Sequence, residues 1–431
     1  MKEEKVIKIL KKPKGTRALF EEEINKREFL VQKLSYWARS IGFKKIQTPT
    51  FERSSIFLDS NNPEGEILKK ELFFLKNEDY VLKPEETAIV ARTIASEKLL
   101  SCNPSPLKFF YSSQCFRHER PQNQRFREFT QFGLEIIKAS SLAYEVELIY
   151  MLDSFFKNTL NLGLLKLRVN FLSNKETRRK WTKELTKYFL KNNEGLSNNS
   201  LERIKNNPIR ILDDEKDSLL DIVKKAPKIQ QFLSEEELER IKKIKRFLSE
   251  LGVDYTWDET LVRGLDYYTG IVFEWNYRGL GVAGGGRYDE LFNKFSHLSK
   301  DLKDVPSVGL AIGIERLIHS LEKSEYEWPT QPNKKVYLCN LFPEVESKII
   351  ELIKKLRDND LEVESNWELK DLKSHFKFSE KQNIKWLLIY GAKEKENNEI
   401  ILKEQNKSFQ ISFPLSKDED LIRELQNLVE H

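Results

Sequence analysis

The spacing of apolar residues divides the chain into helical and extended segments. Residues 21–41 are predicted to form a helix, because apolar side chains recur at helical spacing and Gly42 follows as a stop signal. Residues 107–116 and 126–138 are predicted to be two strands of a long hairpin, joined by the charged loop 117–125. Residues 176–251 are mostly helical in pattern and rich in lysine and glutamate, with turn residues at 192–200.

The part of the chain after residue 251 changes pattern twice. "GIVFEWNY" predicts a strand, "GLGVAGGGRYDE" a glycine-rich turn, and "SVGLAIGIERLIHSL" a short strand that runs into a helix. The polar stretch "YEWPTQPNKK" has two prolines and no periodicity, which is typical of a linker. Beyond it, the apolar runs "VYLCNLF", "LEVESNW" and "WLLIYG" alternate with helical segments, so a small α/β domain is predicted.

Length and composition agree with a multidomain globular protein. A chain of 431 residues is expected to form two or three domains. Its net charge of +5 is small against 73 basic and 68 acidic residues, so any basic binding surface must be local. No apolar run approaches a membrane span, no targeting segment is recognisable, and the three cysteines form no paired framework. We expect a cytoplasmic protein with no membrane and no DNA partner.

The second hairpin strand, "FREFTQFGLE", carries the most informative polar pattern. Side chains alternate faces along a strand, so Gln131, Gly133 and Glu135 share one face with Arg127 and Phe129. That face would be turned to water about as often as to a ligand. A mid-strand glycine often marks a close approach by a ligand or backbone, and Arg117 could lie above the same face.

Other polar clusters have two interpretations each. Glu85, Glu86 and Thr87 follow a proline where a helix could begin, which is also a plain capping pattern. "AGGGRYD" lacks the lysine and spacing of a P-loop, so its glycines indicate a tight turn or close packing. Arg316 lies near a helix start, a position that favours anions but is often plain surface. No two of the five histidines have metal-ligand spacing, and no protein-held metal is predicted.

Together these segments resemble the histidyl-tRNA synthetases, which are class II aminoacyl-tRNA synthetases, along nearly the whole chain. "FRHERPQNQRFREFTQFGLEI" is similar to motif 2 of that class, "GLAIGIERL" to motif 3, and "KGTRALF" with "IQTPTFERSSIF" to the N-terminal region and motif 1. "LVRGLDYYTGIVFEW" and "AGGGRYD" resemble the two signatures particular to histidyl enzymes.

The resemblance implies an α+β fold and a two-step reaction. We expect a class II catalytic domain over residues 1–325, an antiparallel sheet flanked by helices with a helical insertion at 172–252. A linker at 326–332 and a C-terminal α/β anticodon-binding domain at 333–431 would follow. The implied enzyme is a histidine–tRNA ligase that uses ATP and Mg²⁺, binds L-histidine and tRNA(His), and forms a homodimer around motif 1.

Site residues are carried over only where the motifs match. Arg117 and Arg263 are the implied catalytic residues. The implied histidine-binding set is Glu85, Thr87, Gln131, Glu135, Arg263, Tyr267, Tyr268 and Tyr288. ATP would be bound by Arg117, Arg125 and Arg316, and the tRNA acceptor end by Arg120 and Gln122. Fixed cations suit this chemistry, because attack of a carboxylate on the α-phosphate brings anions together.

One departure from the family falls inside the site. The family usually has "RPEGT" where this chain reads "KPEET", so Glu86 replaces a glycine and Lys83 an arginine. The extra carboxylate could crowd the substrate or alter the local charge.

The main alternative is a paralogue that keeps the fold without charging tRNA, such as the regulatory subunit of ATP phosphoribosyltransferase. Such paralogues typically lose the motif arginines, the "LVRGLDYY" signature or the C-terminal domain. This chain retains all three features.

Overall fold

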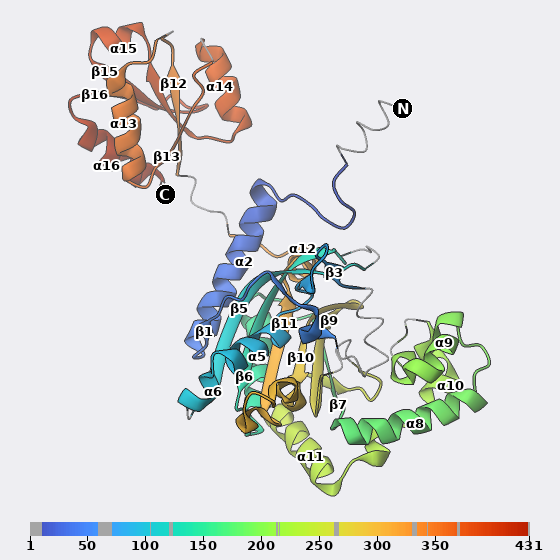
Figure 1. Cartoon of the computed structure of the whole chain (residues 1–431). Coiled ribbons are helices and arrows are strands. Elements are labelled where there is room, and N and C mark those ends of the chain that lie inside the picture. The colour runs from blue at the N-terminus through green and yellow to red at the C-terminus, as the bar shows by residue number, and fades with distance from the viewer. Residues whose placement is uncertain are drawn as a thin grey trace. The chain divides into compact units, whose positions relative to one another are not determined.

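The chain divides into two compact units, Met1–Tyr326 and Glu327–His431. The computed structural model describes residues 11–58, 71–103, 105–119, 124–212, 214, 216–262, 267–329, 334–342, 344–368 and 371–429. Within those ranges no helix is long and apolar enough to cross a membrane. Each unit contains its own sheet, and the predicted α+β fold class is confirmed (Figure 1).

The first unit is built on an eight-stranded sheet. Its order is β1 (Lys44–Lys45), β5 (Leu107–Phe116), β6 (Glu128–Ile137), β11 (Ser307–Gly313), β10 (Leu280–Arg287), β9 (Ile271–Tyr277), β7 (Lys166–Phe171) and β8 (Tyr255–Trp257). The six strands from β5 to β7 are antiparallel, as expected, whereas the edge strands β1 and β8 pair in parallel. A second, small sheet is formed by β2 (Phe51–Arg53), β4 (Tyr80–Leu82) and β3 (Phe73–Phe74), and β2 lies within the motif 1 segment.

The N-terminal helix begins and ends close to its predicted position, whereas several shorter helices of this unit were not predicted. The N-terminal helix is α2 (Glu21–Ser40), which buries Leu30, Leu34 and Ala38 on one face. The other helices are α3 (Ser54–Phe57), α5 (Thr87–Ser96), α6 (Leu99–Cys102), α7 (Ala143–Ser154) and α12 (Ile314–Lys323). The predicted hairpin is confirmed as β5 and β6, and the predicted strand–helix pair as β11 and α12.

One expectation is wrong. The glycine-rich segment "GLGVAGGGRYDE" does not form a turn, because residues 280–287 form strand β10 in the middle of the sheet. Close packing explains the glycines: a Cβ atom on Gly285 would lie 2.1 Å from the carbonyl oxygen of Gly309. The turn comes just before the strand, where Arg278 and Gly279 adopt positive φ angles of 49° and 89°.

Among the described residues between strands β7 and β8, the α-helices are α8 (Lys175–Lys191), α9 (Asn198–Asn206), α10 (Asp221–Lys224) and α11 (Glu235–Glu250) (Figure 1). Asn174 caps α8, and Ser234 with Glu237 forms a capping box on α11, so polar side chains in the sequence set where these helices start. Their core includes Trp181, Leu185 and Phe189 and continues into Tyr268 and Val272.

The second unit has a five-stranded sheet in the order β13 (Glu362–Ser365), β12 (Lys335–Asn340), β14 (Trp386–Tyr390), β15 (Glu399–Glu404) and β16 (Gln410–Pro414). Strands β13, β12 and β14 are parallel, and β15 and β16 are antiparallel additions. The helices are α13 (Ser347–Asp358), α14 (Leu372–Lys381), α15 (Ala392–Glu396) and α16 (Asp418–Val429). The apolar core that α13 and α16 form with this sheet contains only residues of the same unit.

Candidate active site

The candidate site is centred on Glu135, a carboxyl group buried in the middle of the large sheet. Glu135 is only 1% exposed, and in the strand register it lies opposite Phe109 of β5 and Gly309 of β11. A Cβ atom on Gly309 would lie 1.8 Å from Glu135 Oε2. The glycine in β11 therefore creates the space that this carboxyl group occupies.

Three hydroxyl groups donate hydrogen bonds to Glu135. Thr87 Oγ1 and the Tyr111 hydroxyl donate to Oε1, at 2.7 and 3.2 Å, and the Tyr288 hydroxyl donates to Oε2 at 2.5 Å. Thr87 and Tyr288 were expected near the imidazole or amino group of a substrate, but Tyr111 was missed. The mid-strand Gly133 could have indicated Tyr111. The two residues pair across the hairpin, and a Cβ atom on Gly133 would lie 2.2 Å from the Tyr111 ring.

Burial dominates the electrostatics of Glu135. Loss of solvent raises the pKa of its carboxyl group to about 8, and nearby Glu85 pushes the pKa in the same direction. Hydrogen bonds from Tyr288, Thr87 and Tyr111 act in the opposite direction. Near neutral pH the group can therefore exchange a proton, which suits a carboxyl that meets a titratable ring.

Glu85 provides a second buried carboxyl group at the start of α5. Its oxygens accept from the backbone N–H groups of Thr87 and Ala88, at 2.8 and 2.9 Å, and from the Tyr267 hydroxyl at 3.2 Å. Glu85 therefore caps the start of α5 and also belongs to the candidate site. Burial raises the pKa of Glu85, although the two backbone donors oppose the shift.

Aromatic rings stand beside these carboxyl groups. The Tyr267 ring centroid lies 5.0 Å from that of Tyr268 and 6.0 Å from that of Tyr288. Tyr268 and Tyr288 are 6% and 1% exposed, so both side chains are buried beside the carboxyl groups and do not lie on the protein surface. Gln131 lies on the same strand face as Glu135, where its Oε1 accepts from the Cys115 thiol at 3.4 Å. The structure thus brings six of the residues assigned to histidine together with Tyr111. Gln131 precedes Glu135 along β6, on the same face of the strand.

Three arginines gather at the other end of the site. Arg316 donates to the carbonyl oxygens of Gln124 and Gly281, at 3.3 and 2.8 Å. Its pKa is lowered, first by burial and then by the charges of Arg125 and Arg117. The positive charges of these arginines repel one another, which raises the free energy of the empty site. A bound anion would offset that repulsion.

Arg117 contacts one neighbour in the segment before α5 and one in strand β6. Its Nε donates to the carbonyl oxygen of Pro84 at 2.9 Å, and its guanidinium lies 5.2 Å from the centroid of the Phe129 ring. Pro84 immediately precedes Glu85, so Arg117 is tied directly to the segment that carries the second carboxyl group. Arg125 forms an ion pair with Glu119, at 3.1 Å.

Three predicted site residues lie outside the described parts of the chain: Arg120, Gln122 and Arg263. Their assigned roles remain those implied by the resemblance.

The departure from the family sequence proves to be a matched pair. Lys83 Nζ lies 3.1 Å from Glu86 Oε2, and the two side chains are 3% and 1% exposed. Thr48 Oγ1 donates to Glu86 at 2.5 Å and accepts from Lys83 at 3.2 Å. The extra negative charge is therefore neutralised by the lysine that accompanies it, within a polar triad beside the site.

Breaking this pair from either side should destabilise the protein strongly. We expect Lys83→Met and Glu86→Leu each to lower the free energy of unfolding by about 3–5 kcal/mol, because each leaves a buried charge unpaired. The double variant should recover most of that loss, since two apolar side chains leave no charge behind. Denaturant unfolding of all four proteins gives the coupling energy, and additive losses would contradict the pairing.

Comparison with known proteins agrees with this geometry. A family model described as histidyl-tRNA synthetase matches residues 15–317, and a model of an anticodon-binding domain matches residues 335–425. The histidine–tRNA ligase of Malacoplasma penetrans is 37% identical over 411 residues, which cover 92% of this chain and 94% of that protein.

Two solved structures are also similar. Apo histidyl-tRNA synthetase from S. aureus has a TM-score of 0.75 and 27% identity, covering 97% of this chain and all of that one (100%). An ATP phosphoribosyltransferase regulatory subunit/histidyl-tRNA synthetase from Bacillus halodurans has a TM-score of 0.61, covering 89% of this chain and 99% of that one. Its 22% identity indicates a shared fold alone. With a family model over most of its length and a close full-length relative, the chain belongs to the histidyl-tRNA synthetase family.

Proposed function

We propose that the chain is a histidine–tRNA ligase. It activates L-histidine with ATP, giving histidyl-adenylate and diphosphate, and then transfers histidine to the 3′ end of tRNA(His). The observation that carries the proposal is one buried cluster of side chains in which Glu135, three hydroxyl donors and Glu85 lie together. A cluster of three arginines stands at its other end.

We propose that these side chains line a pocket that matches the polar groups of histidine. In the proposed complex Glu135 and Tyr268 bind the ring nitrogens, with Tyr267 and Tyr288 beside them. Glu85, Thr87 and Gln131 receive the α-amino group. A site whose buried groups are all matched by one substrate rejects analogues that leave those groups unpaired.

The arginines fit a nucleotide in the same way. Arg117 holds the α-phosphate and Arg316, with Arg125, the far phosphates of ATP, because guanidinium groups stay charged and bind oxygens in a fork. Glu119 and Glu274 are close enough to Arg316 to oppose the lowering of its pKa, so carboxylate oxygens of the kind that Mg²⁺ prefers stand at this end. When bound with ATP, Mg²⁺ would neutralise phosphate charge.

In the first step a carboxylate oxygen of histidine bonds to the α-phosphorus, and the bond from that phosphorus to the diphosphate oxygen breaks. The residues of this chain position both reactants and stabilise the negative charge that concentrates at the α-phosphate. We assign that stabilisation to Arg117 and Arg263. Arg120 and Gln122 are proposed to contact the acceptor end of the tRNA in the second step.

The same assignment covers the rest of the chain. Residues 1–325 would form the catalytic domain, with the insertion at 172–252, and residues 333–431 would bind the anticodon. We also propose a homodimer in the cytoplasm.

An amino-acid panel in an ATP–pyrophosphate exchange assay tests this function. Histidine alone should support exchange of labelled diphosphate into ATP. Exchange with another amino acid in place of histidine would overturn the substrate assignment. A protein that binds histidine without any exchange would instead support the regulatory-subunit alternative.

Replacing the central carboxyl group should weaken histidine selectively. Glu135→Gln should cost about 1–3 kcal/mol of histidine binding, because three hydroxyl donors and the substrate ring then face an amide. ATP binding should change little, since the arginines are untouched. Calorimetric titration with each ligand separates the two effects, and equal losses would mean that Glu135 only supports the sheet.

Histidine binding should also depend on pH through the same group. With a pKa of about 8, Glu135 is mainly neutral below that pH and becomes a carboxylate as the pH rises through it. A ring N–H group donates more strongly to a carboxylate, so histidine affinity should increase on the order of tenfold from about pH 6.5 to about 8.5. In Glu135→Gln this increase should disappear, and an unchanged pH profile in that variant would contradict the assignment.

A further inference from the structure

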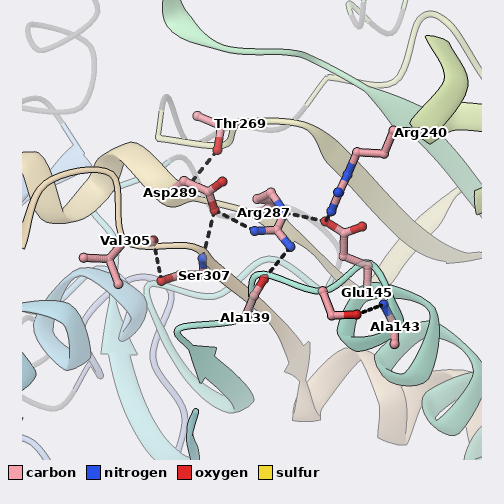
Figure 2. Close-up of polar contacts among 10 residues, drawn as sticks. Ala139, Ala143, Glu145, Arg240, Thr269, Arg287, Asp289, Val305 and Ser307 are labelled. Atoms are coloured by element: carbon pink, nitrogen blue, oxygen red, sulfur yellow. Dashed lines mark hydrogen bonds and ion pairs between the residues drawn. The ribbon is translucent and has the colours of Figure 1, made fainter. Parts of the chain in front are cut away.

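A buried arginine, Arg287, ends strand β10 just before Tyr288 of the proposed histidine pocket. It is 6% exposed, and its three nitrogens contact three different groups (Figure 2). Nε pairs with Glu145, Nη1 with Asp289 at 2.9 Å, and Nη2 donates to the carbonyl oxygen of Ala139 at 2.8 Å. Because these partners lie in different directions, the guanidinium is held in one orientation.

The charges around Arg287 form a closed network. Glu145 on α7 is fully buried, and its Oε1 also accepts from Arg240 of α11 at 2.9 Å. Its other oxygen, Oε2, is buried without a hydrogen-bond partner among the described residues. Two arginines therefore balance Glu145 and Asp289, and removing Arg287 would leave a buried carboxylate with one partially exposed partner.

The backbone around Arg287 is bonded to the segment that carries the tyrosine pair. The Thr269 N–H donates to the Arg287 carbonyl oxygen at 2.6 Å. The Asp289 N–H donates to Thr269 Oγ1 at 3.0 Å, as Figure 2 shows. These two bonds join Thr269 to both residues that flank Tyr288. Gly270, with a φ of +77°, packs above the Arg287 side chain, where an added Cβ atom would lie 3.4 Å from Cδ.

Asp289 extends the connection to the strand beside Glu135. Its Oδ1 accepts from the Ser307 N–H at 2.8 Å, and Ser307 begins β11, the strand that pairs with β6. The Tyr288 N–H in turn donates to the Ser307 carbonyl oxygen at 2.9 Å. Tyr288 is thus fixed from both neighbours while its hydroxyl donates to Glu135.

We propose that Arg287 is a positioning residue for histidine recognition, which sets Tyr268 through Thr269 and sets Tyr288 through the adjoining backbone. The proposal rests on histidine being the substrate. Arg287 touches no reacting atom. It determines the positions of the Tyr268 and Tyr288 side chains. A displacement of about 1 Å in such a pocket can weaken recognition by up to about a hundredfold, whereas the arginines assigned to the phosphates belong to other segments.

The test compares two variants with wild-type protein in histidine-dependent ATP–pyrophosphate exchange. Arg287→Lys keeps the charge but cannot make three divergent bonds. Thr269→Val keeps the shape of the side chain and removes only the acceptor for the Asp289 N–H. Each should raise the KM for histidine about tenfold and leave the KM for ATP within about twofold. Arg203→Lys is the matched control, because Arg203 pairs with Asp214 at 3.0 Å within the helical insertion.

The outcomes separate position from stability. If Arg287→Lys and Thr269→Val raised both KM values equally, or left the KM for histidine at the level of Arg203→Lys, the proposal would be overturned. If Arg287→Lys did not fold, Thr269→Val would decide by the same two constants. A wild-type protein without histidine-dependent exchange would overturn the proposed function and this inference with it; an active wild type with unaffected variants would overturn the inference alone.

Discussion

Arg117→Ala should reduce the rate of histidyl-adenylate formation by about 10²–10³-fold, the usual effect of removing one fixed group that stabilises developing charge. Arg117 is restrained by the Pro84 carbonyl oxygen and the Phe129 ring, so its charge is in place before the substrates bind. Because the negative charge at the α-phosphate is greatest in the transition state, turnover should fall more than the affinity for histidine. Single-turnover measurement of adenylate formation provides the rate.

Two variants make this result specific. Arg117→Lys keeps a positive charge but loses the two-pronged hydrogen bonding of a guanidinium group. Its rate of adenylate formation should lie between those of the wild type and Arg117→Ala. Lys108→Ala removes a cation from the start of β5, the strand that ends just before Arg117. There Lys108 lies 3.5 Å from Glu147, and its loss should leave the rate unchanged. A rate for Arg117→Ala equal to that for Lys108→Ala would remove Arg117 from the reaction.

Removing residues 333–431 should leave adenylate formation largely intact and reduce tRNA charging by about a hundredfold or more. All residues proposed to act in activation precede this segment, whereas two linked binding modules raise the overall affinity for a long ligand by about 10²–10⁴. The apolar core of the second unit contains only its own residues, so the first unit should still fold. Exchange and charging assays on the same preparation give both rates.

The salt dependence and the subunit mass complete that experiment. If lysines and arginines of the C-terminal unit hold tRNA phosphates, charging by the full-length protein should weaken steeply as salt rises. A truncated protein that becomes monomeric would explain a loss of activation through the dimer rather than through the site. A dimeric truncated protein that charges tRNA at the full-length rate would show that the anticodon-binding assignment is wrong.

Much of the fold follows from local patterns. The 3.6-residue period of α2, the strand-forming runs of β5 and β6, and the polar caps of α8 and α11 all act over a few residues. The three parallel strands of the second unit were also predictable, because short apolar runs are local signals, whereas the linker at 326–332 stays a prediction. Glycines are ambiguous at this level: the run in β10 indicates a turn until the neighbouring strand is known.

Some residues of the candidate site could be placed from local patterns, and others only from the tertiary structure. Gln131, Gly133 and Glu135 could be placed on one face from the sequence, because a strand has a fixed period. The hydroxyl groups around Glu135 could not, since Thr87, Tyr111 and Tyr288 lie 48, 24 and 153 residues away in the chain. Their convergence depends on the order β5–β6–β11–β10 and on the register that places Gly133 and Gly309 opposite large side chains.

By itself, the sequence determined the class of fold, the hairpin of β5 and β6, helix α2, and the motif residues that indicate histidine and ATP. Only the tertiary structure decided that Lys83 neutralises Glu86, that Tyr111 completes the shell of Glu135, and that Arg287 joins α7 to the tyrosine pair. The physical reason is that periodicity and capping are properties of neighbouring residues. Burial, charge pairing and the resulting pKa of a carboxyl group depend on which distant strands pack side by side.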